Sequence, residues 1–425
     1  VGEEKMSSCY PHPAYAFTTI FDPIYARPLG VTLIWIFALE MHRYMHVHGI
    51  KKEGFESVTP DISYKEMMFE AATRAYQDAG NISPRKDIDA FISVAEDYWE
   101  GFSIFDEFVP DQLGAVLRHL FTVSGDSIIG LATANMLIKT GHFDVVAVES
   151  HGKPSDILTL YDVVSFAMDP ILNRPLGGHP FYVGGMEMNR FLCETGNSKE
   201  QCAMVVAKNK GNALANPFAA YGADTDVEDV LRSDPCFYPL NKLDISQPSD
   251  GGVVIVLASD EVAYKLNDNP TWLKGVGWIC DTPSLETRCW SEAVYARMAA
   301  DMAYKHAGIN TPSKEVDFAE VDDLFSYKEL QHMEALRLCG KGQAGTLTEE
   351  GVTSLDGYLP VNPSGGMLGM GWPLEASGMQ RLLEVVLQLR GEAGSRQLSD
   401  VEVGVAQSWR GIPTATGAVA VLSNC

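Results

Sequence analysis

Three kinds of feature are missing from this sequence. The longest apolar run is Val31 to Leu39, far below the roughly 20 residues of a membrane span. The formal net charge is −24, and the sequence has no basic run that would offer a local exception. The chain would therefore repel the phosphate backbone of nucleic acid. The eight cysteines never form a CxxC pair, which disfavours a zinc ribbon and a redox motif. These absences predict a protein of the reducing cytoplasm that binds neither membranes nor nucleic acid.

The composition indicates an ordinary globular chain. With 425 residues and 46% hydrophobic content, the chain is long enough for two or three domain-sized units around a large core. Function must therefore be sought in repeats and motifs.

An internal repeat is the most informative feature. Segments 72–89 (ATRAYQDAGNISPRKDID) and 300–317 (ADMAYKHAGINTPSKEVD) align without a gap. In each, an amphipathic helix ends at an Ala-Gly pair, where Gly80 and Gly308 suit a left-handed C-cap. Pro84 and Pro312 then precede an apolar run. The sequence thus predicts helix, loop and strand twice.

The same order recurs further along the chain. The sequence predicts helices at 127–140 and 376–389, followed by the strands DVVAVES and VEVGVAQ. Strands that alternate with helices predict an α/β fold with parallel sheets covered on both faces. We expect two similar halves, 54–265 and 266–425. The first half contains a longer, less regular loop region at about 150–245, called the excursion below.

The first 53 residues repeat part of that excursion. DPIYARPLG at 22–30 matches DPILNRPLG at 169–177, and the match continues beyond these motifs. We therefore interpret 1–53 as an extra segment that duplicates the loop region, with a gene fragment as one origin. It carries His42, His46 and His48, but the second copy lacks these imidazoles and no carboxylate completes a site, so we predict no metal.

A glycine-rich segment is the strongest candidate for function. VNPSGGMLGMGWPLEASG at 361–378 places small residues around Asn362 and one bulky Trp372. Glycines allow close approach to the backbone. The alternative is a tight turn between a strand and a helix.

Several motifs together resemble the thiolase superfamily, in particular its lipid-transfer-protein-like branch. Besides the glycine-rich segment they are LDISQPSDGGVVIVLAS at 243–259, EVDDLFSYKEL at 320–330, LCGKGQAG at 338–345 and RGIPTATGAVAVL at 410–422. The resemblance implies a duplicated βαβαβαββ unit in a five-layer α-β-α-β-α sandwich, and an acyl-CoA substrate. Coenzyme A would enter as part of the substrate, with no permanently bound cofactor.

The catalytic positions of the family are changed here. The position of the nucleophilic cysteine corresponds to Ser124, and that of the Gly-His-Pro histidine to Trp372. The SWRG stretch at 408–411, where relatives often hold a second cysteine, has no sulfur, and Asp322 stands where a histidine is common. A serine needs an adjacent base to attack a thioester, so the sequence argues against ordinary thiolase chemistry.

The resemblance nevertheless implies a set of site residues. We expect Ser124, Asp322, Asp323 and Ser326 to be catalytic, with one aspartate as base and Ser326 or Tyr327 as helper. The alternative is that the two aspartates form a strand-end turn and an N-cap. The expected ligand and oxyanion cradle, with the pocket around it, consists of Asn362, Ser364, Gly365, Gly366, Gly369, Trp372, Ser408 and Gly411.

Three functions remain open from the sequence. The first is an enzyme that makes or breaks a carbon–carbon bond beside a CoA thioester without an acyl-enzyme. The second is a catalytically silent CoA-ester-binding subunit, paired with a thiolase-like chain or a small zinc-ribbon/OB-fold partner. The third is a true acetyl-CoA acyltransferase whose nucleophile is another residue. For assembly, the resemblance implies a homodimer or a heterodimer built the same way.

Overall fold

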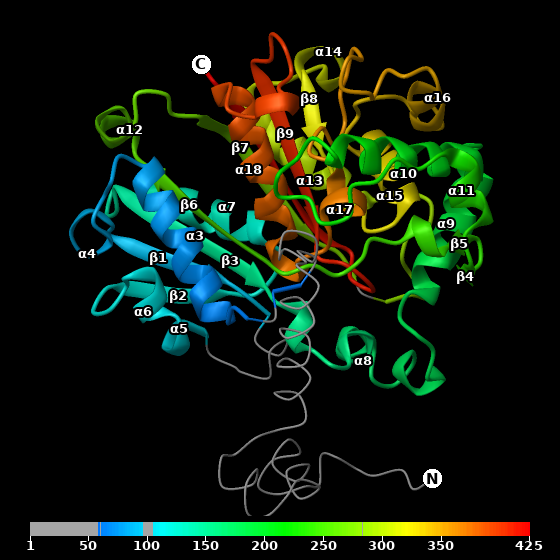
Figure 1. Ribbon diagram of the computed structural model, residues 1–425, viewed down its shortest axis with the longest axis horizontal. Helices are drawn as coiled ribbons and strands as arrows, with labels where there is room; N and C mark the ends of the chain where they lie inside the picture. Colours follow the sequence, from blue (N-terminus) through cyan, green and yellow to red (C-terminus); the bar gives the residue numbers. More distant parts are fainter. Residues whose placement is uncertain (1–57, 60, 97–104, 283) are drawn as a thin grey trace, which may run out of the picture. The chain divides into compact units, whose positions relative to one another are not determined.

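The computed structural model of the protein describes residues 58–59, 61–96, 105–282 and 284–425 (Figure 1). The predictions for 1–53, including those for its histidines, lie outside the described residues and stay predictions.

Two four-stranded sheets organise the part of the chain that the structure describes. The first has the order β2-β1-β3-β6, and the second has the order β7-β10-β9-β8. In the first, β1 is parallel to β2 and β3, but β6 is antiparallel to β3. In the second, β8 and β9 are parallel, while β10 is antiparallel to both neighbours. The predicted parallel sheets are therefore mixed, because later strands of the chain enter each sheet in the opposite direction.

The bounds of the strands follow the apolar runs of the sequence. They are β1 (Ala90–Val94), β2 (His119–Val123), β3 (Val145–Gly152), β6 (Gly251–Ala258), β7 (Trp272–Cys280), β8 (Phe318–Glu320), β9 (Val403–Trp409) and β10 (Thr416–Ser423). Every residue of β1, β3 and β10 is buried, as expected for strands covered on both faces.

Helices separate and cover the two sheets. Helices α7 (Ser127–Lys139) and α18 (Ser377–Arg390) contact each other and both sheets, so they form the middle layer. Helix α3 (Tyr64–Asp78) packs on the first sheet and α13 (Val294–Ala307) on the second (Figure 1). The expected α-β-α-β-α order of layers is confirmed.

The duplicated segments fold alike. Helix α3 begins with a capping box between Ser63 and Glu66, and Gly80 follows it with φ of 90°. Helix α13 ends at Gly308, which has φ of 76°. Each is followed by a short helix that starts at the predicted proline and then by a strand; these short helices are α4 (Pro84–Asp87) and α14 (Pro312–Glu315). The predicted repeat of helix, loop and strand is confirmed.

The excursion is mainly helical. It contains α8 (Leu160–Ser165), α9 (Tyr182–Thr195), α10 (Lys199–Ala213), α11 (Val227–Arg232) and the hairpin β4 (Pro235–Phe237) with β5 (Leu240–Asn241). Helix α10 contacts three helices of the second half, α15 (Ser326–Ala335), α16 (Ala344–Glu349) and α17 (Gly366–Met370). The excursion therefore packs directly against the glycine-rich segment.

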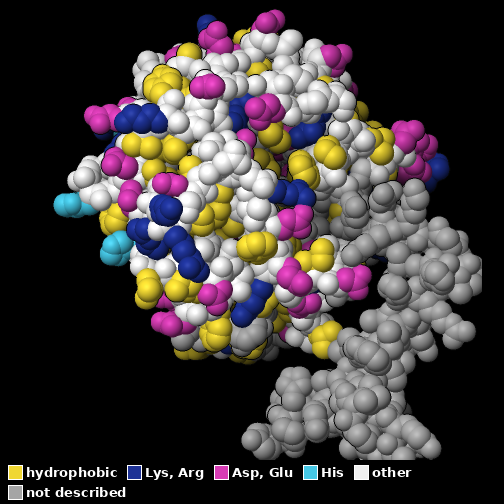
Figure 2. All heavy atoms as spheres, turned by 60° about the vertical axis from the view of Figure 1, so that its left-hand side comes forward, with side chains coloured by type: hydrophobic (Ala, Val, Ile, Leu, Met, Phe, Trp, Pro, Cys, Tyr) yellow, Lys and Arg dark blue, Asp and Glu magenta, His cyan; other side chains and the backbone are white. Residues whose placement is uncertain are grey.

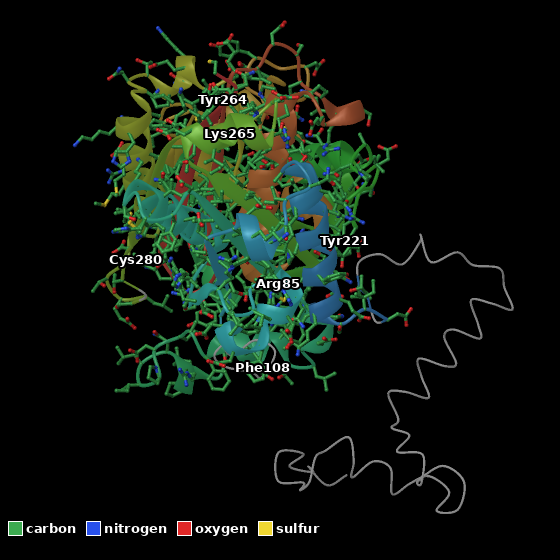
Figure 3. All side chains as sticks on the ribbon, turned by 90° about the vertical axis from the view of Figure 1, so that its left-hand side faces the viewer. Arg85, Phe108, Tyr221, Tyr264, Lys265 and Cys280 are labelled. Carbon is green, nitrogen blue, oxygen red and sulfur yellow. The ribbon has the colours of Figure 1, made fainter. Side chains whose placement is uncertain are left out.

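The remaining elements are short α-helices and 3₁₀-helices. They are α5 (Phe105–Phe108), α6 (Pro110–Leu113), α12 (Asp260–Leu266), η5 (Pro154–Asp156), η6 (Arg174–Leu176), η7 (Lys242–Asp244), η8 (Leu374–Ala376) and η9 (Gly394–Arg396). Tyr264 and Lys265, labelled in Figure 3, lie on α12, and Cys280 ends β7.

The surface carries mixed charge. Lys and Arg side chains are interspersed with acidic and apolar side chains on the face in Figure 2. Of the helices that the structure describes, none combines the length and the apolar character needed to cross a bilayer.

Candidate active site

Ser124 lies in the short connection between β2 and α7. Its hydroxyl donates to Glu96 Oε2 at 3.0 Å and accepts from Arg410 Nη2 at 3.0 Å. Arg410 Nε also pairs with Glu96 Oε1. Glu96 follows β1 of the first sheet, whereas Arg410 follows β9 of the second. These three residues, called the outer group below, therefore join the two sheets.

The outer group is open to solvent on one side. Ser124 is exposed, and the side chain of Arg410 is 32% exposed, while that of Glu96 is 7% exposed. A carboxylate can accept a proton, and a guanidinium can stabilise an anionic oxygen. No thiol stands between β2 and α7, where Ser124, Gly125 and Asp126 follow one another.

Asp126 begins a second, buried group. It is the N-cap residue of α7, and its carboxylate accepts from the Ile128 N–H at 3.3 Å. Burial raises the pKa of Asp126 to about 7, and the nearby Arg381 and Ser408 limit the rise. Arg381 Nη2 donates to Asp322 Oδ2 at 3.0 Å. Asp126, Ser408, Arg381 and Asp322 form the inner group, and each is at most 2% exposed.

The two predicted aspartates need correction. Asp322 is fully buried against Arg381, and its Oδ1 accepts from Leu324 N–H at 3.1 Å. The Ser124 hydroxyl donates to Glu96 rather than to Asp322 or Asp323. The strand-end turn of the alternative prediction is supported, because Asp322 follows β8 and accepts from Leu324 N–H. Its N-cap part is wrong, because the N-cap residue of α15 is Phe325, which makes no side-chain cap.

Asp323 binds the glycine-rich segment instead. Its carboxylate accepts from the N–H groups of Met367 at 2.6 Å and Leu368 at 3.2 Å, and from Asn209 Nδ2 at 2.8 Å. Burial, with the nearby charge of Glu329, raises the pKa of Asp323 to about 7. Asp323 therefore ties the glycine-rich segment to α10.

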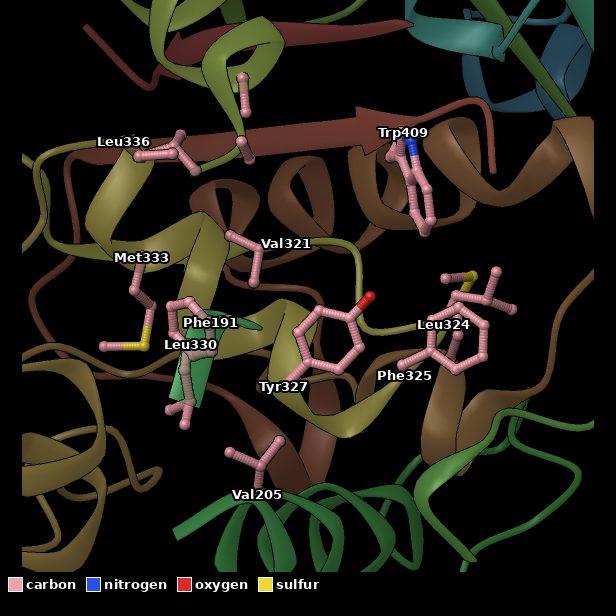
Figure 4. Close-up of a cluster of buried hydrophobic side chains, with 14 of the residues drawn as sticks. Phe191, Val205, Val321, Leu324, Phe325, Tyr327, Leu330, Met333, Leu336 and Trp409 are labelled. Carbon is pink, nitrogen blue, oxygen red and sulfur yellow. The ribbon is translucent and has the colours of Figure 1, made fainter. Parts of the chain in front are cut away.

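The other predicted helpers also lie in the protein interior. The Ser326 hydroxyl donates to Asp244 Oδ1 at 2.6 Å, and both residues are buried. Figure 4 shows Phe325 and Tyr327 among buried apolar side chains, with Trp409 of β9 nearby. In this conformation neither Ser326 nor Tyr327 is exposed to a substrate.

The glycines serve close contacts within the protein. A Cβ at Gly366, where φ is 57°, would lie 2.2 Å from Asp323 Oδ2. A Cβ at Gly365 or Gly369 would lie 2.6 or 2.5 Å from Ala213 Cβ. Side chains at these positions would therefore separate the segment from α10 and Asp323.

The expected oxyanion cradle is not available in this conformation. The backbone N–H of Ser364 donates to Glu320 Oε1 at 2.8 Å, and its hydroxyl donates to Glu320 Oε2 at 2.7 Å. The side chain of Asn362 accepts from Val321 N–H through Oδ1 and donates to Glu329 Oε2 through Nδ2. The N–H groups from Ser364 to Gly369 all donate within the protein. A thioester oxygen would have to displace these acceptors.

Trp372 is a core residue. It is 8% exposed, and its ring centroid lies 6.2 Å from that of Phe181. Its backbone N–H donates to Gln247 O at 2.8 Å, and its carbonyl accepts from Ser249 N–H at 3.1 Å. In contrast, no described atom beyond the chain neighbours of the buried Gly411 lies within 4 Å of where its Cβ would be.

Sequence reasoning missed Glu96, Arg410, Asp126 and Arg381. For Asp126 a signal existed, since an aspartate directly before an apolar helix is a typical N-cap. Arg410 lies between the predicted residues Ser408 and Gly411 in the SWRG stretch, but its own role was not predicted. Glu96 and Arg381 are far from Ser124 and Asp322 in the sequence, and no local pattern connects them.

Comparisons with known proteins agree with the architecture. A family model described as Thiolase C-terminal domain-like matches residues 280–424. An acetyl-CoA acetyltransferase of Methanothermobacter thermautotrophicus is 31% identical over 90% of this chain and 100% of its own. Sterol carrier protein 2 of Oryctolagus cuniculus is 31% identical over 56% of this chain and 45% of its own.

A solved structure shows the same fold. It is described as an Ltp2-ChsH2(DUF35) aldolase, with a TM-score of 0.73 and 23% identity, and it covers 86% of this chain and 94% of that one. The chain therefore belongs to the thiolase superfamily, in its lipid-transfer-protein-like branch.

Proposed function

We propose that the protein binds acyl-CoA thioesters and breaks or forms the carbon–carbon bond beside the thioester, without an acyl-enzyme. The observation that carries this proposal is the outer group, in which a carboxylate, a hydroxyl and a guanidinium meet beside solvent. Acid–base chemistry of this kind requires a proton acceptor and a stabilised oxyanion, and needs no thiol.

In the direction of cleavage, Glu96, Arg410 and Ser124 each have one role. Glu96 takes the proton of the β-hydroxyl group of a β-hydroxyacyl-CoA, and the bond between the α and β carbons breaks. The β carbon becomes an aldehyde or ketone, and the electron pair moves into the thioester as an enolate. Arg410 stabilises the enolate oxygen, and the α carbon then takes the proton back from Glu96. Ser124 orients both groups through its hydrogen bonds to them.

One observation favours the silent-subunit alternative. Glu96 and Arg410 are paired with each other, so a substrate must separate them before either acts. A chain in which the pair stays closed would bind an ester without turnover. The acetyltransferase activity named for the archaeal relative is the third outcome to be tested.

We also propose a partner and a location. The solved relative is described by two names, Ltp2 and ChsH2(DUF35), which supports an assembly of a thiolase-like chain with a second protein. A homodimer, a heterodimer with a thiolase-like chain, or a complex with a small zinc-ribbon/OB-fold protein would fit. The described cysteines are free thiols, which supports a cytoplasmic location.

A substrate panel with paired variants tests the proposal. Purified protein is incubated with acyl-CoA and β-hydroxyacyl-CoA esters, and carbonyl release is followed by mass spectrometry. Glu96→Gln should lower carbonyl release by about 100-fold or more. The control Glu70→Gln changes an exposed carboxylate on α3 that pairs with Arg74 and should be silent. Equal rates in Glu96→Gln and wild type would contradict the assignment.

A further inference from the structure

Two short segments meet in a regular way where the sheets join. Ser124 and Arg410 meet on the exposed side through a hydrogen bond of 3.0 Å. Two residues further along the first segment, and two residues back along the second, Asp126 and Ser408 are both buried. The Ser408 hydroxyl is near enough to Asp126 to lower its pKa, but it makes no hydrogen bond within the described residues. The outer and inner groups are therefore held by the same two pieces of backbone.

Helix α18 approaches this junction very closely. A Cβ at Gly378 would lie 2.0 Å from Asp126 Oδ1, and Met379 N–H donates to Ser127 Oγ at 2.7 Å. Arg381 extends from the same helix to Asp322, and its Nε donates to Gln407 O of β9 at 2.7 Å. The inner group thus connects α7, α18 and β9.

We propose that Asp126 is a positioning residue, which holds the segment of Ser124 against the segment of Arg410 through the inner group. The inference rests on the proposed function, because Ser124 and Arg410 belong to the site assigned there. Asp126 itself is buried and does not touch a substrate.

The charges of the inner group give this role a pH dependence. The groups that face Asp126 are the Ile128 N–H of its own helix, Ser408 of β9, Arg381 of α18 and Asp322. Arg381 pairs with Asp322, and its charge also lowers the pKa of Asp126. Lys328 and His332 lie beyond Asp322. Burial raises the pKa of both aspartates, so Asp126 changes charge around neutral pH.

The test compares two changes at Asp126 with a matched helix cap. Asp126→Ala removes the cap and the inner contact, whereas Asp126→Asn keeps a capping side chain but cannot ionise. The control Asp226→Ala removes an exposed N-cap on α11, where Asp226 Oδ1 accepts from Asp229 N–H at 2.8 Å. For each variant we would measure hydrogen–deuterium exchange in residues 119–127 and 403–412. We would also measure the kinetics of carbonyl release and their dependence on pH.

We expect Asp126→Ala to speed exchange in both segments and to lower kcat by about tenfold or more, with KM nearly unchanged. Asp126→Asn should keep the wild-type exchange rates and the wild-type kcat at pH 6. Its pH profile should lack the ionisation that Asp126 shows near neutral pH. Asp226→Ala should change neither segment. If Asp126→Ala loosens only α7 and leaves 403–412 unchanged, the positioning role is wrong. The exchange arm needs no turnover, so it stays decisive if the proposed activity fails.

Discussion

Replacing Gly366 by alanine should destabilise the fold through Asp323. The left-handed φ of 57° costs an alanine about 1–2 kcal/mol. The new Cβ would also lie 2.2 Å from Asp323 Oδ2, so the carboxylate must move away from Met367, Leu368 or Asn209. Losing one such bond to a buried carboxylate costs about 1.5–3 kcal/mol. We expect a total loss of about 2.5–5 kcal/mol in the free energy of unfolding, measured by urea denaturation.

Gly391→Ala is the matched control for backbone strain. Gly391 has φ of 74° after α18, and no described atom lies within 4 Å of its Cβ position. This variant should lose only about 1–2 kcal/mol. The reasoning is refuted if Gly366→Ala loses no more than Gly391→Ala but binds acyl-CoA more weakly. Those two results together would support the ligand-binding role of Gly366 that the sequence predicts.

Three further predictions follow from burial and sheet edges. Trp372→His should lower the unfolding free energy by about 2–4 kcal/mol in calorimetry, because the indole packs in the core, and should create no thiolase turnover; unchanged stability with altered acyl-CoA selectivity would contradict this. Asp126 has a folded pKa of about 7, above its unfolded value, so the stabilising effect of its neutral form is present below pH 4 and is lost as pH rises through 7. Asp126→Asn should thus gain up to about 4 kcal/mol relative to wild type between pH 4 and pH 8, and parallel denaturation curves would refute this. Light scattering should find a dimer paired through a sheet edge such as β2; a monomer at micromolar concentration would contradict this.

Local signals made the repeated elements predictable. The helix C-caps at Gly80 and Gly308 and the prolines after them act within a few residues, so the sequence indicates them directly. The predicted helices at 127–140 and 376–389 agree with α7 and α18 to within about one residue, because apolar periodicity and capping define their ends. The direction of the later strands depends on sheet pairing, which leaves no local signal.

The site could not be assembled in the same way. Ser124 is 28 residues from Glu96 and 286 from Arg410 in sequence, and only the closure of the two sheets brings them together. The glycines reveal that something approaches the backbone, but not what. A ligand was the expectation; in the structure Ala213 and Asp323 fill that space.

The central claim is that carbon–carbon chemistry occurs here without an acyl-enzyme. Rapid-quench incubation with a β-hydroxyacyl-CoA, followed by intact-protein mass spectrometry and carbonyl analysis of the same samples, tests it most directly. We expect release of an aldehyde or ketone, no consumption of free CoA, and an unmodified protein mass at every time point. A burst of acylated protein that transfers its acyl group to CoA would contradict it.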